Sequence, residues 1–141
     1  MIQKKLAKQH MIFGKIYKNK KTYPLLKAIT AFWIIIIFYL SFIPGNDLPK
    51  VNNIPNLDKI VHFSLYAVFT FLCLLTLSSS KKRIDKKIIL GIIFAIGVFV
   101  EIMQGLLPIE RSFSFFDMLA NTSGILTGFL IFSLFKRTIT A

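Results

Sequence analysis

The chain has 141 residues, and 55% of them are apolar, including 15 phenylalanines. This composition is too apolar for an ordinary water-soluble domain and indicates a protein that lies in a lipid bilayer. The net charge of +12 comes from 18 basic and 6 acidic residues and would suit a nucleic-acid partner. The basic residues, however, lie in short segments between apolar stretches, which excludes that reading. The single cysteine, Cys73, excludes an intramolecular disulfide and a cysteine-based metal site.

The first predicted element is a basic tail of residues 1–24, which either lies as a helix on the membrane surface or stays solvated. Four apolar stretches follow, at residues 25–43, 60–77, 88–107 and 118–135, and each is long enough to cross the hydrocarbon core as a helix. Residues 136–141 form a short basic end. The predicted fold is therefore all-α, an integral membrane bundle of four transmembrane helices within a membrane domain of residues 25–135.

The basic residues are distributed unevenly over the two sides of this bundle. If the four helices alternate in direction, only Lys50, Lys59 and Arg111 of the 18 basic residues lie on one side, and the other 15 lie on the opposite side. Lysine and arginine are enriched in cytoplasmic segments of membrane proteins, so this asymmetry predicts that both termini are cytoplasmic. The connections before the second and fourth helices then face outward.

Polar residues form one stripe on each of the last three predicted helices. Their spacing of three or four residues puts them on one face: Asp58, His62 and Tyr66 on the second helix, Gly97, Glu101 and Gln104 on the third, and Asp117, Asn121, Gly124 and Gly128 on the fourth. An ionisable group in the membrane interior costs about 2.5–3.5 kcal/mol, so these stripes should face one another and not lipid. With the termini inside, His62, Glu101 and Asn121 lie at similar depths below the outward surface. The sequence therefore predicts a shared polar cavity that opens outward, with Gly97, Gly124 and Gly128 allowing close helix packing.

The sequence allows several interpretations of the chemistry of this cavity. His62 with Glu101 and Asp117 could form a general acid/base pair, a divalent metal site or a structural hydrogen-bond network. The metal site is the least favoured of these interpretations, because the sequence has no His-x-x-x-His or Glu-x-x-His doublet. No metal and no cofactor is therefore predicted.

The other polar residues have expected partners of their own. Arg111 is the expected cation for Glu101 or Asp117, and its guanidinium also suits a carboxylate or phosphate ligand. Tyr66 is expected to donate a hydrogen bond between helices, and Gln104 and Asn121 are expected to join helices. Asp58 has a second reading as the cap of its helix.

These residues together resemble a known family. The pattern is Asp58-Lys59-x-x-His62-Phe63-x-x-Tyr66, then Glu101-x-x-Gln104, then Arg111-Ser112-x-Ser114-x-x-Asp117-x-x-x-Asn121-x-x-Gly124-x-x-x-Gly128. It is similar to that of the VanZ-like family of small bacterial membrane proteins, over residues 40–135, and the basic tail is not part of the shared pattern. The resemblance implies a multi-helix protein of the bacterial envelope, expected in the cytoplasmic membrane, and a link to low-level resistance to the glycopeptide teicoplanin. It implies no particular reaction.

Three functions fit these observations. The favoured one is non-enzymatic: the outward cavity binds an anionic lipid or lipid-linked cell-wall headgroup. The expected binding residues are Asp58, Lys59, His62, Tyr66, Glu101, Gln104, Arg111, Asp117 and Asn121. The alternatives are an outer-leaflet hydrolase or transferase that uses His62 with Glu101 or Asp117, and a transporter or flippase component. The expected partners are the lipid bilayer and this headgroup, without nucleic acid, and a homo-oligomer is left open.

Overall fold

The structure is a computed structural model that describes residues 22–47, 56–80 and 84–140. Within these ranges the chain forms helices and no strand: α2 Thr22–Phe42, the short 3-10 helix η1 Gly45–Asp47, α3 Leu57–Ser79, α4 Lys86–Leu106 and α5 Phe115–Thr140. Its four long helices are long and apolar enough to cross a membrane, which confirms the predicted all-α fold with four membrane-spanning helices. Most of the predicted basic tail, residues 1–21, lies outside the described residues.

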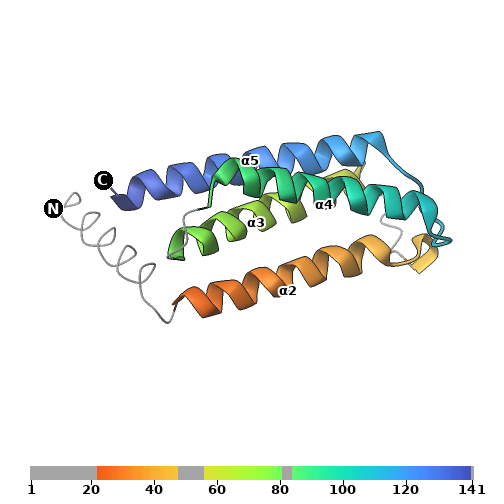
Figure 1. The fold of residues 1–141 in the computed structure, drawn as a ribbon. Helices are drawn as coiled ribbons and strands as arrows, with labels where there is room; N and C mark the ends of the chain where they lie inside the picture. The colour runs from red at the N-terminus through yellow and green to blue at the C-terminus, as the bar shows by residue number, and fades with distance from the viewer. Residues whose placement is uncertain (1–21, 48–55, 81–83, 141) are drawn as a thin grey trace.

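Successive long helices run in opposite directions, so the bundle has two distinct ends (Figure 1). The end of α2, η1, the start of α3 and residues 107–114 before α5 lie together at one end, which we call the polar end. The backbone N–H of Gly45 donates to the carbonyl of Ile109 at 2.9 Å, and this bond joins the η1 segment to the connection between α4 and α5. Segments from both halves of the chain are thereby fixed around the polar end.

Capping residues explain where two of the helices begin. The Asp85 side chain accepts a hydrogen bond from the backbone N–H of Lys87 at 2.9 Å, and the Ser114 hydroxyl accepts one from that of Asp117 at 3.2 Å. Each satisfies an amide that the first helical turn leaves unpaired. The helix α3 instead follows Asn56, which has a left-handed backbone (φ 55°) and no side-chain cap bond. Asp58 is thus a first-turn residue and not the cap of α3.

The most extensive helix contact is between α3 and α5, and it depends on two glycines. A Cβ added to Gly124 would collide with the backbone oxygen of Phe63, and one added to Gly128 would collide with that of Ala67. Only a residue without a side chain fits at these two positions, so the two backbones approach directly. This close approach turns one face of α5 toward α3.

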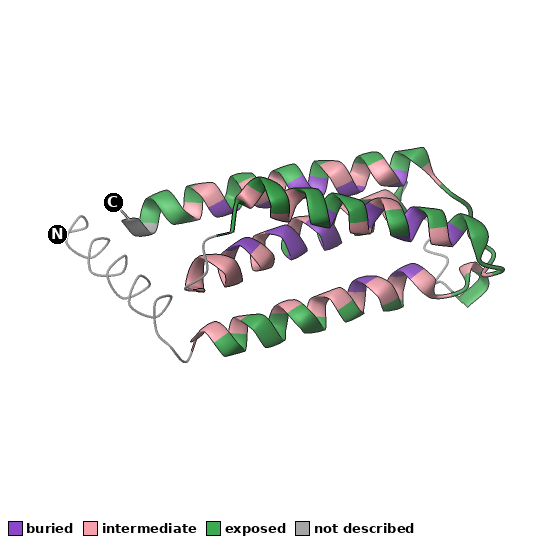
Figure 2. Cartoon of the chain, in the orientation of Figure 1, coloured by how far each residue is buried: buried purple, intermediate pink, exposed green. Residues whose placement is uncertain are grey.

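Buried and exposed residues are distributed as a lipid environment requires (Figure 2). Glu101 is fully buried, whereas the apolar side chains of Leu106 and Phe116 are 71% and 67% exposed. In water such an apolar surface would be a liability, but in a bilayer it contacts lipid while polar groups are kept inside. Trp33 Nε1 donates to the Leu65 carbonyl at 3.0 Å and joins α2 to α3 inside this surface.

Candidate functional site

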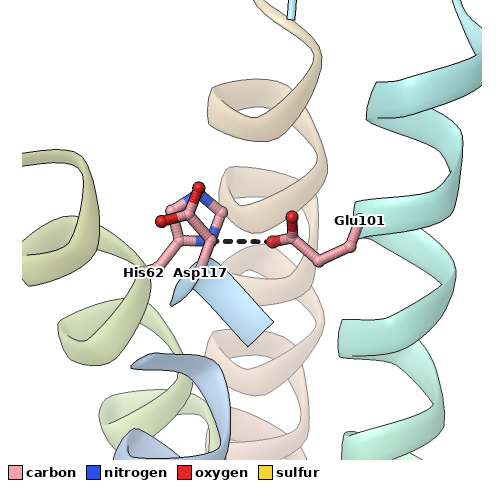
Figure 3. A group of neighbouring side chains, drawn as sticks. All are labelled: His62, Glu101 and Asp117. Carbon is pink, nitrogen blue, oxygen red and sulfur yellow. Dashed lines mark ion pairs between the residues drawn. The ribbon is translucent and has the colours of Figure 1, made fainter. Parts of the chain in front are cut away.

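Polar side chains from α3, α4 and α5 meet near the polar end. One ligand-type atom from each of His62, Glu101 and Asp117 lies within 4.8 Å of the others, and all three residues are buried (Figure 3). His62 lies five residues after the start of α3, and Glu101 lies five residues before the end of α4. At about 1.5 Å per residue, both are roughly 7.5 Å from the ends of their helices. The structure therefore brings His62 and Glu101 to one level, and Asp117, two residues after the start of α5, joins them from nearer the end of the bundle.

Asn121 links His62 to Glu101. Asn121 Nδ2 donates to Glu101 Oε1 at 3.2 Å, and Asn121 Oδ1 lies 3.1 Å from His62 Nδ1. His62 Nδ1 is also 3.4 Å from Glu101 Oε1. One carboxylate oxygen of Glu101 is thus engaged, whereas Oε2 is buried without a hydrogen-bond partner.

The cation that pairs with Asp117 is Lys59, and not Arg111 as the sequence suggested. Lys59 Nζ lies 3.3 Å from Asp117 Oδ1 and 2.7 Å from Asp58 Oδ2. Asp117 Oδ1 has no hydrogen-bond partner, so its contact with Lys59 is a charge pairing without good hydrogen-bond geometry. Lys59 lies nearly one helical turn before His62, on the same side of α3, and its long side chain reaches across to the start of α5.

Arg111 lies in the connection between α4 and α5 and contacts the end of α2. Its Nη2 donates to the Leu40 carbonyl at 3.4 Å, its Nε is buried without a hydrogen-bond partner, and no ion pair joins it to Glu101 or Asp117. Partial burial lowers the pKa of Arg111, while the nearby carboxylates oppose this shift. A guanidinium stays protonated in proteins, so Arg111 adds a positive charge at the polar end.

Two further predicted residues lie beside the cluster without joining its hydrogen bonds. Gln104 Nε2 donates to the Ser41 carbonyl at 2.8 Å and joins α4 to α2, in agreement with its expected role. Tyr66 is fully buried, and its ring packs where a Cβ on Gly97 would lie 3.3 Å from it. Its hydroxyl has no hydrogen-bond partner, so the prediction that Tyr66 donates a hydrogen bond between helices was wrong.

Sequence reasoning missed the acceptors at the end of α2 and the role of Ser114. The last carbonyls of a helix have no partner within it, and those of Leu40 and Ser41 are satisfied by Arg111 and Gln104. Such an acceptor cannot be predicted from a sequence, because it is a backbone group that every residue has. Ser114 had a usable signal, because Ser-x-x-Asp before an apolar run is a capping pattern.

A crevice of about 590 Å³ lies at the end of α2, and it is separate from the residues of the cluster. Its walls are Phe38, Tyr39, Phe42, Ile43, Pro44 and Asp47. Aromatic and apolar side chains make up most of this lining. The crevice is therefore suited to apolar groups, whereas the cluster holds the charges.

Four membrane-capable helices that bury a polar cluster near one end define a multi-pass membrane protein. The family model described as VanZ/LLP1 matches residues 15–136, and the chain belongs to this family. The match begins before residue 40, so it includes the first helix and the last part of the basic tail, which the resemblance in sequence had left out. A search of curated proteins found no match, and a search of solved structures found none either.

Proposed function

We propose that this VanZ/LLP1 protein binds an anionic lipid or lipid-linked cell-wall headgroup at its polar end. Binding there would change the access of teicoplanin-type glycopeptides to the envelope. The proposal includes an orientation in which the polar end faces away from the cytoplasm. Only three of the 18 basic residues belong to this side of the bundle, which is the asymmetry expected of an outward face.

The observation that supports the proposal most strongly is the hydrogen bonding of Arg111. Its guanidinium makes one long hydrogen bond, to the Leu40 carbonyl at 3.4 Å, and leaves Nε without a partner. A guanidinium has several N–H donors in a planar fork that matches the oxygens of a phosphate. Arg111 therefore has donors in reserve for an anionic ligand.

Lys59 and the carboxylates set the arrangement of such a ligand. The Lys59 side chain is 31% exposed and supplies a second cation near the start of α3. Glu101 and Asp117 would repel a phosphate placed deep in the cluster. The phosphate therefore stays at Arg111 and Lys59, while hydroxyl or amide groups of the ligand reach toward His62.

The experiment compares Arg111→Ala with wild type in lipid nanodiscs, titrated with phosphatidylglycerol and with undecaprenyl pyrophosphate. Loss of a charge-assisted hydrogen bond should weaken binding about tenfold or more, and Arg111→Lys should lie between the two. Lys87→Ala is the matched control, because Lys87 is an exposed cation at the opposite end. Equal affinity of wild type and Arg111→Ala for both lipids would remove the proposal.

A second candidate function, an outer-leaflet hydrolase or transferase, is favoured by the His62–Glu101 pair at 3.4 Å. A buried imidazole beside a carboxylate is the arrangement that a general base needs. If turnover of a lipid-linked substrate is found, His62→Ala should abolish it. Equal turnover in that variant would exclude His62 as the base.

A further inference from the structure

We infer that His62, Glu101 and Asp117 form a binding site for one divalent transition-metal ion. The three side chains come from three different helices, and one ligand atom of each lies within 4.8 Å of the others. Ligands that converge from separate helices on a single point are the usual form of a metal site in a helical bundle. This inference stands whether or not a headgroup binds at Arg111.

The second observation is a pair of buried carboxylate oxygens without hydrogen bonds. Glu101 is fully buried, and its Oε2 has no partner. Asp117 Oδ1 also lacks a hydrogen bond and has only the Lys59 contact at 3.3 Å. An unsatisfied carboxylate oxygen is expensive inside a protein and more so at membrane depth, and a cation is the partner that it favours most.

Asn121 supplies the outer contacts that a metal site needs. It bonds Glu101 Oε1 at 3.2 Å and lies 3.1 Å from His62 Nδ1, so it orients two of the three ligands at once. Ligands held by such contacts lose little conformational freedom when the ion arrives.

The charge at the site leaves room for an added cation. Asp58, Glu101 and Asp117 act together on Arg111, and Arg111 and Lys59 are the two cations among them. The site therefore holds three carboxyl groups and two cations. Lys59 also keeps Asp58 at 2.7 Å as a partner, so it can release Asp117 without becoming an unpaired charge.

The donor set indicates which class of ion binds. One imidazole nitrogen with two carboxylate oxygens suits Zn²⁺ or Mn²⁺, whereas Ca²⁺ and Mg²⁺ favour sets made only of oxygen. Three protein ligands also leave one coordination position for a water or another small ligand.

The test uses full-length protein without a histidine tag, in nanodiscs, with His10→Gln as background because His10 is the only other histidine. The probe is ZnCl₂ alone, and bound zinc is measured by elemental mass spectrometry after gel filtration. We expect about one zinc per chain, lost in Glu101→Gln and Asp117→Asn. Glu110→Gln, which changes an exposed acid on the same connection as Arg111, should keep the zinc.

A measurement on the unaltered site covers the case in which these variants fail to fold. X-ray absorption of the zinc-loaded background protein should show one imidazole among nitrogen and oxygen ligands. Absence of retained zinc, or a spectrum without imidazole scattering, would overturn the inference. So would folded Glu101→Gln and Asp117→Asn proteins that both retain zinc as the background does.

Discussion

Asn121 is the residue on which the geometry of the cluster depends most. It is 2% exposed and bonds side chains of α3 and α4 from its own position on α5. Its amide offers an acceptor to His62 and a donor to Glu101, which a carboxylate or an aliphatic side chain cannot do. Lys59 and Arg111, by contrast, have long and flexible side chains. The spacing of residues in the sequence does not determine which partners such side chains contact. This is why the sequence predicted the level of the cluster but assigned the wrong cation to Asp117.

Replacement of Asn121 by Ala should therefore destabilise the bundle. Loss of both contacts leaves His62 and Glu101 without their buried partner and should lower the free energy of unfolding by about 1–2 kcal/mol. Reversible unfolding in mixed micelles measures this change. Thr122→Ala, which removes only a bond to the Met118 carbonyl within the same helix, is the control and should change stability less. Equal effects of the two substitutions would show that Asn121 does not join the helices.

At the scale of elements, the pairing of α3 with α5 positions the site, because it brings His62 opposite Asn121. The glycine spacing on α5 and the polar spacing on α3 and α4 were enough to predict which faces turn inward. The helix ends were harder to predict, because α3 and α5 continue past their apolar stretches into polar residues such as Asp58 and Asp117. Hydropathy marks the part of a helix that lies in lipid, whereas capping residues such as Ser114 determine where it begins.

Gly124→Ala tests this helix pairing. Its new methyl group would meet the Phe63 carbonyl and the Ala67 amide, both of them backbone, so the helices must separate. We expect a loss of about 1–3 kcal/mol in the free energy of unfolding, as for other overpacked sites. Gly91→Ala is the matched control: nothing lies within 4 Å of its added Cβ, and alanine favours a helix by about 1 kcal/mol relative to glycine. An equal response of both variants would contradict the close contact.

At the scale of the whole molecule, the polar cluster lies near one end of the bundle and most of the basic residues belong to the other side. The proposed function requires a fixed orientation in the membrane and a polar site near the surface. The basic residues favour the first, and the position of the cluster meets the second. The four spans and the family were available from the sequence, because length, hydropathy and motif order carry that information. The acceptors on the last turn of α2 were not, because they are backbone carbonyls.

The proposed orientation makes a direct labelling prediction. In a Cys73→Ser background, Asn46→Cys in η1 should react with a membrane-impermeant maleimide added to intact cells, and Asp85→Cys before α4 should not. Both positions are exposed, so a difference in reaction reports the side of the membrane. Labelling of Asp85→Cys from outside, with Asn46→Cys protected, would place the cluster near the cytoplasm and contradict the proposed headgroup site.

The convergence of α3 and α4 side chains on one point is most directly tested by solid-state NMR in lipid. With His10→Gln and Glu110→Gln, His62 and Glu101 are the only histidine and glutamate, so labelling with ¹⁵N-histidine and ¹³C-glutamate isolates this one pair. The account predicts strong dipolar dephasing between the His62 ring and the Glu101 carboxylate, as expected for Nδ1 and Oε1 at 3.4 Å. No dephasing, at mixing times long enough to detect a contact across one helical turn, would contradict it.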